Sequence, residues 1–152
     1  MHQRLQNDQL ARLLHSQLYD RMLAFCEQYT PEIPAEPVVQ SWLQRLYSSD
    51  NNLHLIVTLN GNYQITGHMV IDVLQQYGHT VVYCYQAQSD KTNDGTLAEG
   101  LEYMDKLMAA TQASCCIFST AKSTAAFTKK YGYKILRTVM LKCAHNDSVD
   151  DM

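Results

Sequence analysis

Apolar residues recur every three or four positions near the start of the chain, which predicts one helix over about residues 7–29. Three prolines between Thr30 and Pro37 exclude regular helix and central strand from that segment, and a second helix is expected from about Pro37 to Tyr47. The stripe of the first helix should pack in the core, or in part against another subunit. It consists of Leu10, Leu13, Leu14, Leu18, Met22, Phe25, Cys26 and Tyr29.

From residue 53 the pattern changes to that of strands. Residues 53–59 and 63–73 flank Asn60-Gly61-Asn62, a strong signal for a tight turn between antiparallel strands. A further strand over 80–88 completes a predicted meander of three strands. Helical spacing returns over 96–112, and the apolar run 113–120 predicts the next strand.

The segment 126–134 reads Ala-Phe-Thr-Lys-Lys-Tyr-Gly-Tyr-Lys and precedes another strand-like run, 135–142. We expect Gly132 to end a short helix in a left-handed conformation, which a side chain resists. The rings of Tyr131 and Tyr133 should cover the core there. The predicted order is helix, helix, three strands, helix, strand, helix, and a final strand or hairpin.

Composition indicates one globular domain, because the chain has 152 residues, of which 46% are hydrophobic and 18% charged. Within it we distinguish an N-terminal helix with its proline-rich connection (1–37), a main part (38–142) and an acidic tail (143–152). A net charge of −3 gives no electrostatic basis for binding a nucleic-acid backbone.

Neither a membrane span nor a secretory signal is expected. No run approaches the roughly 20 apolar residues that cross a bilayer, and the first ten residues are polar where a signal peptide is apolar.

The five cysteines are Cys26, Cys84, Cys115, Cys116 and Cys143, and their spacing matches no metal site. We interpret most of them as small buried side chains. Cys115 and Cys116 should point to opposite faces of their strand, so they cannot line one site together.

The element order and the Tyr-Gly-Tyr segment resemble the GCN5-related N-acetyltransferase family over about residues 38–142. The resemblance implies an α/β (α+β) fold of the acyl-CoA N-acyltransferase type, with a mixed, mostly antiparallel central sheet flanked by helices. It also implies that acetyl-CoA lies where two neighbouring strands diverge, which here are 80–88 and 113–120.

In that family a glycine-containing loop before a helix holds the pyrophosphate through backbone N–H groups. The matching cofactor-binding positions here are Asn93, Gly95, Thr96, Leu97 and Ala98, with Leu101 at the expected spacing. Thr96 stands where the family has its first glycine, Asn93 replaces its Gln or Arg, and Asp90 and Asp94 add negative charge. A turn followed by a helix cap explains the same residues.

Two further positions depart from the family pattern. Thr128 stands where many members carry the tyrosine that protonates the leaving thiolate, and an aliphatic hydroxyl is too weak an acid for that step. Ala121 replaces a frequent Asn that contacts the cofactor. The family's first strand is also missing or replaced, which would leave a sheet edge open to another segment or chain.

The sequence identifies no catalytic residue with certainty. The candidates are Asp72 and His68, with His54 as another possible base, and Tyr131 as a phenol at the wrong spacing. Tyr83 and Tyr85 are further candidates on the third strand of the meander. Each of these side chains is also what a half-buried strand uses for a single hydrogen bond and ring packing.

Three functions follow from the resemblance. The first is a non-catalytic protein with an eroded acetyl-CoA site that acts through other protein chains, similar to small acetyltransferase-like proteins of tailed bacteriophages that serve in virions or assembly. Such a protein would be cytoplasmic or virion-associated, and it could form homo-oligomers through the N-terminal helix or the open sheet edge. The alternatives are an active N-acetyltransferase using acetyl-CoA and a CoA-binding sensor.

Overall fold

The computed structural model describes residues 2–76, 78–90, 96–118 and 132–133. Its five strands form one sheet in the order β1-β2-β3-β4-β5, and all neighbours are antiparallel except β4 and β5, which are parallel. This mixed, mostly antiparallel sheet confirms the predicted fold class. The elements are β1 His2–Leu5, α1 Gln9–Tyr29, α2 Ala35–Tyr47, β2 Leu53–Leu59, β3 Ile65–Gln76, β4 His79–Ser89, α3 Thr96–Thr111 and β5 Cys115–Phe118.

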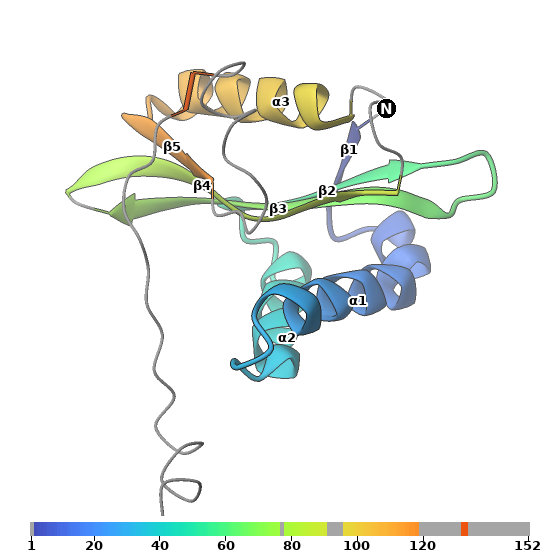
Figure 1. Ribbon diagram of the computed structural model, residues 1–152. Coiled ribbons are helices and arrows are strands. Elements are labelled where there is room, and N and C mark those ends of the chain that lie inside the picture. Colours follow the sequence, from blue (N-terminus) through green and yellow to red (C-terminus); the bar gives the residue numbers. More distant parts are fainter. Residues whose placement is uncertain (1, 77, 91–95, 119–131, 134–152) are drawn as a thin grey trace, which may run out of the picture.

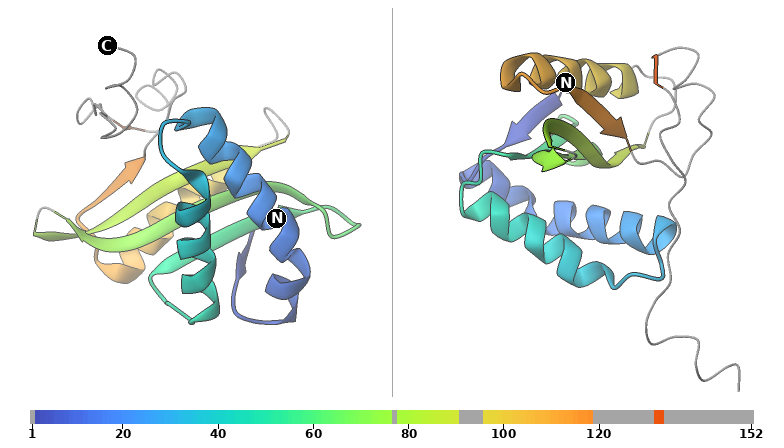
Figure 2. Two further views of the ribbon diagram at one scale, coloured as in Figure 1. Left: turned by 90° about the horizontal axis from the view of Figure 1, so that it is seen from below. Right: turned by 90° about the vertical axis from the view of Figure 1, so that its left-hand side faces the viewer.

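The sheet lies between two helical layers, with α1 and α2 on one face and α3 on the other (Figure 1 and Figure 2). Each face buries its own apolar cluster. Toward α1 and α2 the cluster includes Leu18, Met22 and Val57, and toward α3 it includes Ile71 and Met104.

Helix α1 begins at the predicted place because Asp8 caps it, accepting a hydrogen bond from the backbone N–H of Ala11 at 3.0 Å. Four of the predicted stripe positions, Leu14, Leu18, Met22 and Cys26, are buried. Leu13 was also assigned to the stripe, but its side chain is 65% exposed. It lies next to the buried row, and periodicity alone does not separate the two positions.

Helix α2 begins at Ala35, so Pro37 lies in its first turn and the prediction that helix is excluded through Pro37 was wrong. Backbone N–H groups of a first turn have no partner within the helix, and a proline therefore loses nothing there.

The expectation of a missing first strand was also wrong. Strand β1 pairs antiparallel with β2, in a register that joins His2 to Thr58 and Leu5 to Leu55. Its first three residues are polar and only Leu5 is buried, so a short edge strand of this kind has little hydrophobic signal. The β2 edge that sequence reasoning left open is covered by β1.

The connection between β2 and β3 is longer than the predicted tight turn, since it spans residues 60–64. The Asn60 side chain organises it by accepting hydrogen bonds from the N–H groups of Asn62 (2.9 Å) and Gln64 (3.0 Å). The left-handed position is taken by Tyr63, with φ of 57°, rather than by Gly61. The Asn60 side chain therefore accepts hydrogen bonds that close this loop, whereas a two-residue turn is closed by backbone hydrogen bonds.

Candidate functional site

Strands β4 and β5 lie side by side and run parallel. Their register joins Val81 to Cys115 and Cys84 to Phe118, the last residue of β5 that the structure describes. Strand β4 continues for five more residues to Ser89. The two strands that the resemblance expected to diverge are therefore paired where both are described, and the segment that follows Phe118 lies outside the described residues.

A β-bulge in β4 lies directly after Cys84, the residue that pairs with Phe118. Opposite β3, Val70 pairs with Gln86 and Ile71 pairs with Cys84, which leaves Tyr85 as an extra residue on β4. Because of the bulge, Tyr85 and Gln86 both contact the layer of α1 and α2, while Cys84 lies in the cluster beneath α3.

Asp72, a candidate base, lies at the centre of a buried ion pair. Its carboxylate is 5% exposed and accepts two hydrogen bonds from the Arg45 guanidinium at 2.8 Å each. The hydroxyl of Tyr85 donates to the same carboxylate at 2.9 Å, and Arg45 also binds Asp50 at 2.7 Å. Hydrogen bonding to Asp72 raises the pKa of Arg45, and burial together with the Asp72 charge raises the pKa of Tyr85. A carboxylate with three donors has little capacity left to accept a proton from a substrate.

His68, the second candidate base, is buried in a polar chain against α1. The Nε2 of its ring lies 2.9 Å from the Gln86 side-chain oxygen, and the Gln86 amide nitrogen donates to the Met22 carbonyl and to the Cys26 sulfur, at 3.2 Å each. The Gln86 side-chain oxygen can only accept a hydrogen bond, so the His68 ring must donate from Nε2 and carries its proton there. Burial lowers the pKa of His68 to about 4, so the ring is neutral at pH 7 and a weak base.

The remaining hairpin candidates are also engaged in packing. His54 lies on the other face, with its Nδ1 2.7 Å from the hydroxyl of Tyr103 in α3, and burial lowers its pKa to about 4. Tyr83 packs against Tyr85, with ring centroids 4.9 Å apart. In the described part of the chain, none of these groups is an exposed base.

Helix α3 starts at Thr96, as the loop comparison predicted. In its first turn Ala98 is exposed, whereas Leu101 is 4% exposed and packs in the core. The helix comes so close to β3 that a side chain on Gly100 would overlap the Met69 sulfur. Asn93, Gly95 and Tyr131 lie outside the described residues, as do Thr128 and Ala121.

The charge of Asp90, which sequence reasoning counted against a bound pyrophosphate, is paired. Arg21 of α1 binds it through both guanidinium nitrogens, at 3.0 and 3.2 Å, and also donates to the Ile65 carbonyl. Neither Arg21 nor Arg45 was singled out from the sequence, because each arginine meets its acidic partner 69 or 27 positions away.

The Tyr-Gly-Tyr segment behaves as predicted where the structure describes it. Gly132 has a left-handed φ of 76°, and the ring of Tyr133 meets Phe118 of β5 edge to face at 6.5 Å. Of the adjacent cysteines, Cys115 is exposed and Cys116 faces the α3 cluster. Burial raises the pKa of Cys116 to about 11, so its thiol is protonated at pH 7 and unsuited to attack.

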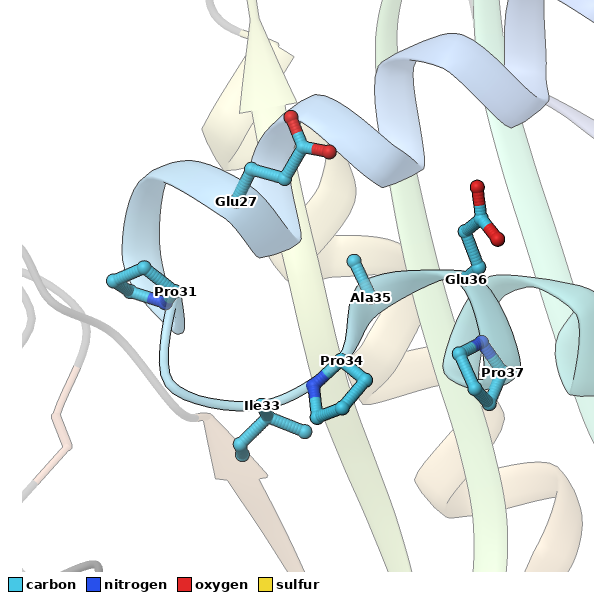
Figure 3. Close-up of a pocket in the computed structure, with 7 residues that line it drawn as sticks. All are labelled: Glu27, Pro31, Ile33, Pro34, Ala35, Glu36 and Pro37. Atoms are coloured by element: carbon cyan, nitrogen blue, oxygen red, sulfur yellow. The ribbon is translucent and has the colours of Figure 1, made fainter. Parts of the chain in front are cut away.

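A shallow depression of about 550 Å³ lies elsewhere, at the connection between α1 and α2. Figure 3 shows the carboxylates of Glu27 and Glu36 on either side of Ala35, above a floor that includes Pro34. It is lined only by residues of α1, α2 and their connection, none of which the sequence singled out for chemistry.

Within the part of the chain that the structure describes, no group of three or more His, Cys, Asp or Glu side chains is placed to hold a metal ion. No described helix is both long enough and apolar enough to span a bilayer.

Solved structures that share this fold include several acetyltransferases. A putative acetyl transferase from Pyrococcus furiosus matches with a TM-score of 0.68 at 14% identity, over 95% of this chain and 100% of the other. An aminoglycoside acetyltransferase from an uncultured soil metagenomic sample has a TM-score of 0.64 and 19% sequence identity, over 95% of this chain and 96% of the other. A Trypanosoma brucei acetyltransferase has a TM-score of 0.66 and 13% identity, over 95% of this chain and 99% of the other.

The chain therefore has the fold of the GCN5-related N-acetyltransferases, and it has that fold over almost its whole length. No protein-family model and no curated protein sequence matches it.

Proposed function

We propose that this protein binds acetyl-CoA beside β4 at the Tyr85 bulge, next to β5, and transfers the acetyl group to an amine. The observation that carries the proposal is this bulge, which leaves Tyr85 without a partner on β3, one residue past the pair of Cys84 and Phe118, in a sheet of the acetyltransferase fold. Backbone groups of β4 suit an extended amide-containing chain such as the pantetheine arm of CoA, because such a chain can pair with a strand.

The start of α3 supports a phosphate-binding role beside that strand. The N-terminus of a helix presents free N–H groups and the positive end of the helix dipole to an anion. Exposed Ala98 leaves space for close approach, and Arg21 offsets the charge of Asp90. Asp90 is one of the two acidic residues that the sequence places against a bound pyrophosphate, and Arg21 of α1 neutralises its charge.

Acetyl transfer at this site would depend on orientation more than on a side-chain base. Asp72 is held by Arg45 and Tyr85, and His68 is neutral with a pKa of about 4. The amine nitrogen would attack the thioester carbon and lose its proton to water, while backbone N–H groups of β4 stabilise the negative charge on the thioester oxygen. The C–S bond would then break, and the CoA thiolate would leave and take up a proton from water. Below the amine's own pKa, the rate should therefore rise with pH.

A non-catalytic role in protein binding, as in a phage virion or its assembly, is the second candidate. It is favoured by Thr128 and Thr96 in the sequence and by the absence of an exposed base at the described site. A CoA sensor, which binds the ligand without transfer, is the third. The presence of β1 removes one argument for the second candidate, since the β2 edge is already paired.

Calorimetric titration with acetyl-CoA and CoA, followed by an assay of thiol release with a panel of amines, separates the three. Binding and transfer support the enzyme, binding alone supports the sensor, and no binding leaves the protein-binding role.

The variant Ala98→Trp should abolish CoA binding by blocking the first turn of α3. Glu102→Trp is the matched control, because Glu102 is exposed one turn further along the same helix. Equal affinity of the two variants would contradict the proposed position of the phosphates.

A further inference from the structure

The bulge at Tyr85 is anchored from helix α2. The Tyr85 hydroxyl donates to Asp72 at 2.9 Å, and its ring stacks on Trp42 with centroids 5.5 Å apart and planes inclined by 23°. Both contacts hold the one residue of β4 that has no partner on β3. Tyr85 directly follows Cys84, whose partner on β5 is Phe118.

We infer that Arg45 and Asp72 are positioning residues that fix the Tyr85 bulge, and with it the part of β4 that receives the acetyl end of the donor. The effect on catalysis rests on the proposed function. The effect on structure can be tested separately, namely that the ion pair determines the backbone conformation of residues 84–86.

The backbone needs such an anchor because a bulge can shift along a strand. Moving the extra residue by one position reverses the faces on which the neighbouring side chains lie. Here that change would turn either Cys84 out of the α3 cluster or Gln86 away from α1. A hydrogen bond from the extra residue to a fixed acceptor on β3 selects one of these registers.

The acceptor is itself held in place from outside the sheet. Asp72 receives two parallel hydrogen bonds from Arg45, a geometry that fixes both the position and the plane of the carboxylate. The Nε of Arg45 makes a separate hydrogen bond to Asp50, whereas Nη1 and Nη2 both serve Asp72.

The test compares Tyr85→Phe and Asp72→Asn with Asp50→Asn. The control also removes an acidic partner of Arg45, but Asp50 makes no contact with Tyr85. For each variant we would measure kcat and KM for acetyl-CoA, the amide hydrogen exchange of residues 84–86, and the exchange of Val57 in β2 as a reference for the whole fold. Tyr85→Phe keeps the ring stack, so it remains informative if Asp72→Asn does not fold.

We expect Tyr85→Phe and Asp72→Asn to lower kcat by about tenfold or more with little change in KM, because a misplaced reacting group costs rate rather than binding. Exchange at residues 84–86 should rise relative to Val57 in both variants and stay at the wild-type level in Asp50→Asn.

If both variants match Asp50→Asn in kcat and in exchange, the inference is overturned while the proposed function stands. If the wild type transfers no acetyl group, the proposed function fails and the catalytic meaning of the anchor fails with it. The exchange data then still decide whether the ion pair fixes the bulge.

Discussion

The two faces of the sheet differ in what they bury. Beneath α3 the cluster consists mainly of Ile56, Met69, Ile71, Val82, Leu101 and Met104, and one buried polar side chain, His54, is paired there with Tyr103. Beneath α1 and α2 the apolar cluster is interrupted by three buried polar side chains, Asp72, His68 and Gln86, which all lie near the Tyr85 bulge.

Ile71 and Asp72 show the contrast most directly, since they are neighbours on β3 and point to opposite faces. Apolar packing stabilises the fold but does not depend on direction, whereas hydrogen-bonded polar groups allow only a few side-chain arrangements. The α3 face therefore holds the sheet together, and the α1–α2 face orients β4 at the candidate site.

The largest effect is expected on the apolar face. Ile71→Ala should destabilise the protein by about 4 kcal/mol, because the fully buried side chain leaves a cavity that the sheet and α3 cannot close. Urea unfolding followed by circular dichroism measures this loss. Ile71→Val, as the control, should cost only about 1 kcal/mol. Similar values for the two variants would show that this face is loosely packed.

Acidification should weaken the polar face through His68. The folded-state pKa of His68 is lowered from 6.5 to about 4, so the unfolded chain binds a proton that the folded chain does not between these pH values. Stability is therefore fully present above pH 6.5 and is lost toward pH 4, by up to about 3 kcal/mol from this residue.

The measurement is the free energy of unfolding at pH 7, 5.5 and 4.5 for the wild type and for His68→Gln. The variant should have a flatter pH dependence, with the remaining slope owed in part to His54, whose pKa is also about 4. An unchanged slope would mean that folding leaves the pKa of His68 at its ordinary value.

Interrupting the polar chain itself should have an intermediate effect. Gln86→Met keeps the approximate shape but removes the acceptor of His68 and the donor to the Met22 carbonyl, at a cost of about 2 kcal/mol. Gln88→Met, two residues along β4 and only half-buried, is the control and should change stability little. Thermal unfolding compares the two variants. Equal shifts in Tm would show that the hydrogen bonds of Gln86 to His68 and Met22 do not stabilise the fold.

The smallest effect on stability is expected at the outer end of β4. The Asp90 side chain is 52% exposed, so Arg21→Met should cost no more than about 1 kcal/mol. The same variant should weaken CoA binding, because the Asp90 charge is then no longer offset. Adding Asp90→Asn to Arg21→Met should restore the affinity in calorimetry, and failure to do so would show that Arg21 acts on the ligand directly.

Local sequence patterns located most of the described elements. The meander of β2, β3 and β4 and the helices α1 and α3 follow from periodicity, since their apolar positions repeat over many residues. Strand β1 was missed because four mostly polar residues carry no such repeat. Tyr63 took a left-handed conformation that Gly61 could have adopted more easily, since the Asn60 side chain determined the loop.

At the candidate site, sequence reasoning named Asp72, His68 and Tyr85 as separate candidates but predicted none of the contacts that hold them. Asp72 and His68 stood out as polar positions within apolar strands. Their meaning depends on Arg45, Tyr85 and Gln86, which reach them from other elements. Seen alone, a polar residue on a strand is equally compatible with a base and with a structural hydrogen bond.

The sequence by itself determined the alternation of helices and strands and the resemblance to an acetyltransferase, because both depend on short-range periodicity and local turn chemistry. Only the tertiary structure decided that β1 closes the β2 edge, which residue forms the bulge, and that Asp72 and His68 are engaged in buried pairs. These facts depend on contacts between residues dozens of positions apart, and the direction and burial of a polar side chain are fixed only when the helices pack onto the sheet.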